Sequence, residues 1–297
     1  MATLYTHQGQ NVRKTWLLMT TFFIIVIAIG FIFARIYDNA SILVFFVIFS
    51  VLMNIISYWY SDKIALSLAK AHPVTREKYF DLYNLVENLS ITAGLPMPKI
   101  YVIEDSSPNA FATGRNKDHA VVAVTTGLLA ILNKTELEGV IAHELAHIGN
   151  KDMLVSTVAV VLAGFVSIIS DMLIRGAIFG GGDNDNRGNG IIAIVGILVA
   201  ILAPIFATLI QFAISRKREY LADATGALLT RYPEGLASAL EKISLNARPM
   251  RVQSGAIAHL YISNPKGDGA FAKKVGHLFS THPPVLDRIN KLRGSLS

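Results

Sequence analysis

The chain has 297 residues, a formal net charge of +6, no cysteine and a mean hydropathy of +0.46, and 52% of its residues are hydrophobic. This hydropathy excludes an ordinary soluble enzyme, and the lack of cysteine excludes disulfides, thiol catalysis and thiolate metal ligands. The positive charges gather beside the apolar segments, so they do not predict binding to nucleic acid.

Two uncharged apolar segments near the N-terminus predict a transmembrane hairpin. Residues 15–34 and 42–60 are each long enough to cross a bilayer core of about 30 Å. Only residues 35–41 separate them, and no small-residue cleavage site follows the first segment. Both features argue against a cleaved signal peptide, which is the alternative interpretation of the first segment.

The residues after this hairpin predict a small sheet beside helices. A helix is expected at 75–93, strands at 99–103 and 120–125, and a short extended stretch at 109–113. A further helix, which carries the sequence His-Glu-Leu-Ala-His, closes this part of the chain.

That helix carries a metal-binding pattern. Thr135 and Glu138 have the spacing of a capping box and predict where the helix begins. His143 and His147 lie four residues apart, on one helical face, so both imidazoles can hold one metal ion. Glu144 can reach a water held on the metal, which predicts a zinc hydrolase with Glu144 as general base. Two surface histidines on an ordinary helix are the alternative interpretation.

A second pair of apolar segments follows the metal-binding pattern. Residues 153–179 and 191–214 predict a second membrane hairpin, joined by the polar loop 180–190. Asp171 and Arg175 lie four residues apart and are expected to pair and to reach toward the membrane surface. A conducting or proton-relay role for this pair is the alternative.

The positions of Lys and Arg predict the orientation in the membrane. Basic residues precede the first apolar segment and follow the second and fourth, whereas few lie at the hairpin tips. The positive-inside rule therefore places both termini and the catalytic segments in the cytoplasm. We predict four parts: a tail with the first hairpin (1–60), the first part of the catalytic domain (61–152), the second hairpin (153–214) and the second part of the catalytic domain (215–297).

The last part of the chain completes the predicted fold class. Helices are expected at 216–230, 234–246 and 285–293. The protein is therefore predicted to be α+β and predominantly helical. It should have four transmembrane helices and a cytoplasmic, zincin-like catalytic domain with a small sheet.

A third metal ligand is expected from this last part. Asn150 and Met153 stand where the metzincin pattern needs Gly and His, so that pattern is excluded. Glu219 follows the fourth apolar segment and would reach the same membrane face as His147. Asp223, four residues on, is placed to accept the other ring N–H of a ligand histidine. The alternative is that Glu219 is one more exposed charge in a charged run.

Contacts with substrate are expected from two further motifs. Asn109, Ala110 and Phe111 lie in the expected extended stretch, which could hydrogen-bond an extended substrate; turn-capping by Asn109 is the alternative. His282 precedes two prolines that fix its backbone, and it is a candidate donor to a developing oxyanion; a surface histidine is the alternative. A scaffold or transporter with a structural zinc would need a fourth protein ligand, and no residue is placed like the other three.

Four motifs in this order resemble the HtpX-type membrane zinc endopeptidases, relatives of the CAAX prenyl endopeptidases. The resemblance covers nearly the whole chain. The motifs are PNAFATG at 108–114, HELAH at 143–147, SRKREYLAD at 215–223 and THPP at 281–284.

This resemblance implies a multi-pass protease of the bacterial inner membrane that faces the cytoplasm and contains one Zn²⁺ per chain. Its substrates would be unfolded or misassembled membrane proteins, often under heat or envelope stress; it would contact lipid, and self-cleavage is compatible with this activity. Carried over by position, His143, His147 and Glu219 match the zinc ligands, Glu144 the base, and Asp223 the acidic residue of the ExxxD signature.

Overall fold

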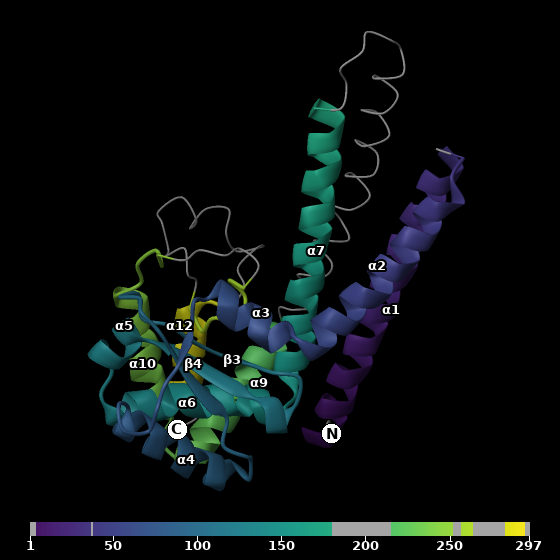
Figure 1. The fold of residues 1–297 in the computed structure, drawn as a ribbon. Coiled ribbons are helices and arrows are strands. Elements are labelled where there is room, and N and C mark those ends of the chain that lie inside the picture. The colour runs from purple at the N-terminus through teal and green to yellow at the C-terminus, as the bar shows by residue number, and fades with distance from the viewer. Residues whose placement is uncertain (1–3, 37, 180–214, 252–256, 264–282, 295–297) are drawn as a thin grey trace.

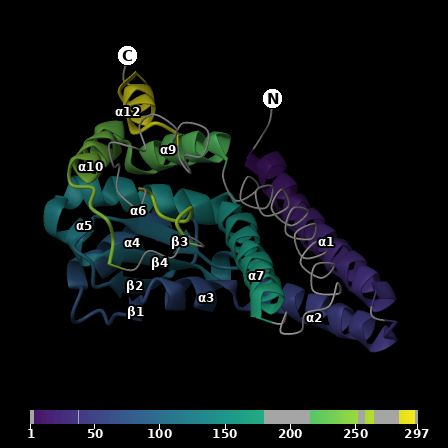
Figure 2. The ribbon, with the colours of Figure 1, turned by 90° about the horizontal axis from the view of Figure 1, so that it is seen from above.

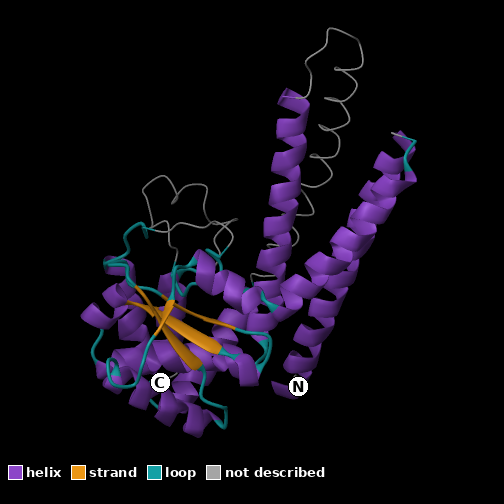
Figure 3. Cartoon of the chain, in the orientation of Figure 1, coloured by secondary structure: helices purple, strands orange, loops and turns teal. Residues whose placement is uncertain are grey.

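The computed structural model describes residues 4–36, 38–179, 215–251, 257–263 and 283–294. This part of the chain is mostly helical and contains one four-stranded sheet (Figure 3). The predicted α+β, predominantly helical class is therefore confirmed. The fourth apolar segment (191–214), the polar loop before it (180–190) and His282 lie outside the described residues.

Two apolar helices, α1 (Leu4–Ile36) and α2 (Ala40–Trp59), run side by side away from the rest of the molecule (Figure 1). Both are long and apolar enough to cross a membrane, with mean hydropathies of 2.7 over Gly9–Arg35 and 2.5 over Ala40–Trp59. A Cβ at Gly30 would clash with Phe46, so glycine allows the two helices to approach closely.

A sharp bend connects the helix that carries the metal-binding pattern, α6 (Lys134–Gly149), to the apolar helix α7 (Asp152–Phe179). The two helix axes differ by 83°, and Lys151 at the bend has φ +57°. By length and composition the described residues contain two membrane spans, or three if α6 and α7 together form a broken span. Asp171 and Arg175 belong to α7, and the placement of their side chains is not described.

The sheet has the strand order β1-β2-β4-β3, in which β2 and β4 are parallel and the outer pairs are antiparallel. All five residues of β4 are buried, as expected for a central strand covered on both faces. The expected strand at 99–103 is β2, whereas the stretches predicted at 109–113 and 120–125 each begin one residue later, as β3 and β4. The bounds are β1 His72–Pro73, β2 Lys99–Ile103, β3 Ala110–Thr113 and β4 Val121–Thr125.

The helix α6 lies in the middle of the fold. Figure 2 shows it between the sheet and a layer formed by α9, α10 and α12, and its apolar residues Val140, Ile141 and Leu145 are fully buried. The three helices of this layer were predicted to within one residue at each end, at 216–230, 234–246 and 285–293. The remaining bounds are α9 Arg216–Thr230, α10 Pro233–Leu245, α12 Val285–Gly294, α3 Ser61–Leu68, α4 Phe80–Ala93, α5 Thr126–Ile131 and a 3₁₀ helix at Lys117–His119.

The predicted capping box of α6 was wrong by two residues. Asn133 is the N-cap: its side chain accepts from the N–H of Glu136, and the Glu136 carboxylate accepts from the N–H of Asn133. Glu136 also binds Ser238 and Lys242 of α10, at 2.8 and 2.9 Å, and these tertiary contacts stabilise the earlier register.

The helix predicted at 75–93 begins later than expected, as α4 at Phe80. Arg76 donates to Asn84 and Glu87 over 2.9 Å, which folds the preceding turn back along the helix instead of extending it. The predicted end is correct, because Gly94 adopts the left-handed conformation, φ +65°, that closes a helix.

Candidate metal centre

The helix α6 places the two predicted histidines one turn apart at its buried end. Their Nε2 atoms lie 3.2 Å apart, with the His143 side chain 1% exposed and that of His147 16% exposed. Two ring nitrogens this close need a proton or a cation between them, because two lone pairs would repel each other.

Glu219 of α9 completes a group of three potential ligands. Its Oε1 lies 3.5 Å from Nε2 of His147, and its Oε2 lies 3.8 Å from Nε2 of His143. In the described ranges, these three residues offer ligand atoms that all lie within 4.8 Å of one another. Two ligands of one tetrahedral zinc lie about 3.3–3.4 Å apart. The spacing and chemistry of the group therefore fit such a metal ion.

A glycine brings α9 against α6 at this point. A Cβ at Gly226 would lie only 3.0 Å from the backbone nitrogen of His143, so a larger residue would push the helices apart. Glu219 and Asp223 lie seven and three residues before Gly226, on the same helical face. This close crossing explains why both carboxylates reach the histidines.

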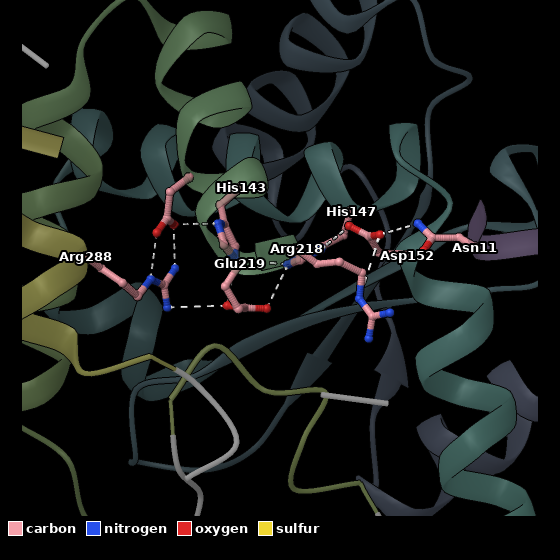
Figure 4. A network of polar contacts seen from close by, with 8 residues as sticks. Asn11, His143, His147, Asp152, Arg218, Glu219 and Arg288 are labelled. Carbon is pink, nitrogen blue, oxygen red and sulfur yellow. Dashed lines mark hydrogen bonds and ion pairs between the residues drawn. The ribbon is translucent and has the colours of Figure 1, made fainter. Parts of the chain in front are cut away.

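On one side, His143 is held by what we call the guanidinium arm, made of Arg288, Asp223 and His143. Oδ1 of Asp223 lies 3.0 Å from Nδ1 of His143, and Arg288 donates two hydrogen bonds of 2.8 and 2.6 Å to the same carboxylate. Burial alone would raise the pKa of Asp223, but the positive charge of Arg288 outweighs it and lowers the pKa to about 2. Arg288 also lies 3.6 Å from Glu219, so it braces two carboxylates (Figure 4).

On the other side, His147 is held by what we call the amide arm, made of Asn11, Asp152 and His147. Oδ2 of Asp152 lies 3.2 Å from Nδ1 of His147, while Oδ1 accepts a 2.6 Å hydrogen bond from the Asn11 amide (Figure 4). Arg218 lies 3.9 Å from that Oδ1, which is longer than a hydrogen bond. In both arms a carboxylate faces Nδ1 and thereby leaves Nε2 for a metal.

Protonation of the two histidines differs in the metal-free protein. Burial lowers the pKa of His143, and the nearby Asp223 offsets this only in part. Burial also acts to lower the pKa of His147, but its contact with Asp152 and the charge of Glu219 outweigh burial and raise the pKa to about 9. His147 therefore carries a proton on both nitrogens at neutral pH, and a metal cation would replace the one on Nε2.

Glu144 lies beside this group and is 2% exposed. Burial raises the pKa of its carboxyl to about 7, despite the opposing charge of His147 and a hydrogen bond from the backbone N–H of Ala112 in β3. A carboxyl with this pKa can accept and return a proton near neutral pH.

Of the predicted substrate-contact residues, Asn109 directly precedes β3 and Ala110 and Phe111 lie in it, and all three are buried. Asn109 donates to the backbone oxygen of Ser263 over 2.9 Å and accepts from its N–H over 3.1 Å. Ala110 and Phe111 are both 0% exposed, and the Ala110 carbonyl accepts a hydrogen bond from Ile262. The segment 257–263 is thus attached to the start of β3.

Arg288, Asp152 and Asn11 were not predicted as site residues from the sequence. Asp152 follows His147 by five residues and opens an apolar segment, which was a usable signal. No local sequence signal pointed to Arg288 or Asn11. Arg288 contacts Asp223 across 65 residues, and Asn11 contacts Asp152 across 141 residues.

The sequence matches peptidase family M48 over residues 76–296. Proteins named "Protease HtpX homolog" are 48% identical in Thermoanaerobacter pseudethanolicus and in Caldanaerobacter subterraneus, each over 98% of this chain and 97% of the relative. A homologue in Tropheryma whipplei is 46% identical over 98% of both chains. The crystal structure of S. mikatae Ste24p aligns with a TM-score of 0.49 at 18% identity over 88% of this chain, which spans about three fifths (61%) of that one.

Membership of family M48 implies a metal cofactor, for which His143, His147 and Glu219 are the candidate site. The apolar helices α1 and α2 are those of a membrane protein. Because the family match covers most of the chain and the relatives are 46–48% identical over nearly its full length, the chain belongs to peptidase family M48 and is an HtpX-type membrane metallopeptidase.

Proposed function

We propose that this metallopeptidase is a zinc endopeptidase whose single Zn²⁺ is held by His143, His147 and Glu219. The observation that carries the proposal is the convergence of these three groups, with a carboxylate facing the outer nitrogen of each imidazole. Two histidines and one glutamate form a common set of ligands for catalytic zinc, which keeps its fourth position for water. A structural zinc would use four protein ligands, and the group found in the described residues has three.

Glu144 is the proposed general base. When bound, zinc supplies Lewis acidity that lowers the pKa of a water and polarises the peptide carbonyl. With a pKa of about 7, the Glu144 carboxylate takes a proton from the attacking water and returns it to the departing amine. The hydrogen bond from Ala112 holds this carboxylate beside β3, where an extended substrate would lie.

We propose that substrates bind as an added strand along the outer edge of β3. The other edge of β3 pairs with β4, and the side chains of Ala110 and Phe111 are buried, so substrate contacts would go through backbone groups beyond the Ala110 carbonyl, which Ile262 already binds. Asn109 would contribute by holding the segment 257–263 at the start of that edge. His282 remains our candidate donor to the oxyanion.

The proposed substrates are unfolded or misassembled membrane proteins. Recognition through the backbone suits them, because such substrates share no side-chain pattern. We place the protein in the bacterial inner membrane as a four-span protein with both termini and the catalytic domain in the cytoplasm. The excess of Lys and Arg beside the spans supports this orientation. In this proposal the chain divides into its four parts at residues 60, 152 and 214. Contact with lipid and self-cleavage complete this proposal.

The test is cleavage of casein in detergent by wild type and by Glu144→Gln, each at measured zinc content. We expect the variant to retain its zinc and to lose activity by about 10²–10⁴-fold, as for removal of a general base. Glu138→Gln, on the same helix but outside the ligand group, is the matched control and should cleave like wild type.

Two outcomes would contradict the proposal. Cleavage by Glu144→Gln at the wild-type rate would remove Glu144 from the mechanism. Full zinc in every protein without cleavage by wild type would instead favour a structural site.

A further inference from the structure

Asn11 is a buried amide in a helix whose other buried residues are mainly apolar. It is 4% exposed and lies two residues before Arg13, at the end of α1 opposite the hairpin tip. Its amide nitrogen donates to Asp152 over 2.6 Å and to the backbone oxygen of Asn150 over 3.1 Å. Both of its N–H groups are therefore used on the junction between α6 and α7.

This junction carries the metal centre. Asn150 closes α6 two residues before α7 begins, and Lys151 between the two helices adopts a positive φ. Asp152 is 2% exposed, and the oxygen that Asn11 does not bind lies 3.2 Å from Nδ1 of His147. One side chain thus separates the Asn11 amide from a proposed zinc ligand.

The helix α1 is long enough to make this contact from within the membrane. Its 33 residues extend about 50 Å, whereas a bilayer core is about 30 Å thick. The end that holds Asn11 therefore projects beyond the apolar core, and Figure 1 places it beside the domain that contains α6 and α9. Arg13 and Lys14 would lie at the membrane surface between Asn11 and the span.

The buried carboxylate of Asp152 must keep one orientation to contact His147. Asp152 can serve His147 only while its Oδ2 faces the imidazole. Arg218 lies 3.9 Å from Oδ1, beyond hydrogen-bond length, and it would attract the carboxylate if the Asn11 amide were absent. Any rotation of the carboxylate that follows would change the 3.2 Å contact between Oδ2 and His147. Asn11 opposes this rotation, because it holds Oδ1 and the adjoining backbone together.

We propose that Asn11 is a positioning residue of the metal centre: by binding Asp152 and Asn150 at once, it fixes the carboxylate that orients His147, so that the first membrane helix contributes to metal binding. The proposal rests on His147 being a zinc ligand, as proposed above. Among the described residues, the hydrogen bonds of the Asn11 amide go to Asp152 and Asn150 and not to a proposed metal ligand.

The test measures the Zn²⁺ dissociation constant of the full-length protein in detergent, by competition with a chromophoric chelator. Asn11→Ala should weaken binding about three- to tenfold, and Asp152→Asn about 10–100-fold, as for other groups that orient metal ligands. Asn11→Asp has the same size but presents a carboxylate to Asp152, so it should weaken binding more than Asn11→Ala. Thr15→Val, one turn along α1 and equally buried, should bind like wild type.

A double mutant separates positioning from mere helix packing. If Asn11 acts through Asp152, adding Asn11→Ala to Asp152→Asn should change the dissociation constant by less than about twofold. The absorption spectrum of Co²⁺-loaded protein should shift with Asn11→Ala and not with Thr15→Val, because the spectrum reports ligand geometry.

The outcomes distinguish this proposal from the function on which it rests. Zinc binding by Asn11→Ala and Asn11→Asp equal to that of Thr15→Val would overturn it, as would full multiplication of the Asn11 and Asp152 effects. If His147→Ala binds zinc like wild type, the metal site itself is wrong. If His147→Ala loses zinc while both Asn11 variants keep wild-type affinity, only the role of Asn11 fails.

Discussion

The guanidinium arm and the amide arm orient the two histidines by different chemistry. In the guanidinium arm, the fully buried Arg288 pairs a complete positive charge with Asp223 through two hydrogen bonds. In the amide arm, Asn11 offers a neutral donor from a membrane helix, and its histidine is 16% exposed instead of 1%.

This difference predicts different consequences when each arm is broken. A buried charge that loses a charged partner costs the fold about 3–5 kcal/mol, whereas the loss of one hydrogen bond from an amide to a carboxylate costs about 1.5–3 kcal/mol. The guanidinium arm should therefore govern the stability of the layer formed by α9, α10 and α12. The amide arm should govern the position of His147 relative to the membrane helices.

The largest expected effect comes from Arg288→Ala, which leaves the buried Asp223 carboxylate without its partner. We expect a loss of about 3–5 kcal/mol in the free energy of unfolding, measured by chemical denaturation of the detergent-solubilised protein. Arg293→Ala, on the same helix but 43% exposed and paired at the surface, is the matched control and should lose far less. Equal losses in both variants would contradict the special role of the guanidinium arm.

A smaller effect should distinguish the two arms in the pH dependence of the unfolding free energy, measured on chelator-treated protein. The pKa of Asp223 is about 2 in the folded state against an ordinary 3.8, so its carboxylate stabilises the fold fully above pH 4. This contribution is lost as the pH falls from about 4 to about 2, and it amounts to about 2 kcal/mol. Asp223→Asn should lack this part of the pH dependence. Asn11→Ala should retain it, because an amide does not titrate; a flat wild-type curve over this range would contradict the pairing.

The smallest expected effect lies outside both arms, at Glu136. Burial acts to raise the pKa of this carboxyl, but Lys242, the Asn133 N–H and Ser238 together lower it. Glu136→Gln should therefore reduce the unfolding free energy by about 1 kcal/mol at pH 7, and the deficit should disappear as the pH falls through the pKa of Glu136. Zinc affinity measured in the same samples should stay at the wild-type value. A loss of zinc would mean that the start of α6 also sets the metal geometry.

The fold was predictable where local patterns decide the structure. Uncharged apolar segments predicted the hairpin of α1 and α2, and the strand predicted at 99–103 has the same ends as β2. The start of α6 was not, because Asn133 and Thr135 are both good N-caps and the contacts of Glu136 with α10 choose between them.

The candidate site divides in the same way. The spacing of His143 and His147, and of Glu219 and Asp223, is local and visible in the sequence. Arg288 and Asn11 act across 65 and 141 residues, and no periodicity links such positions. Residues that contact the candidate metal ligands from distant elements therefore emerge only from the three-dimensional fold.

The candidate metal centre combines residues that lie far apart in the sequence. Asn11 belongs to α1, whereas Arg288 belongs to α12, which follows the helices of the two histidines and Glu219 in the sequence. During translation the two histidines and Glu219 are therefore made before Arg288, and Asp223 lacks its partner until the last helix has folded. The order of synthesis therefore leaves the guanidinium arm incomplete until α12 has been made.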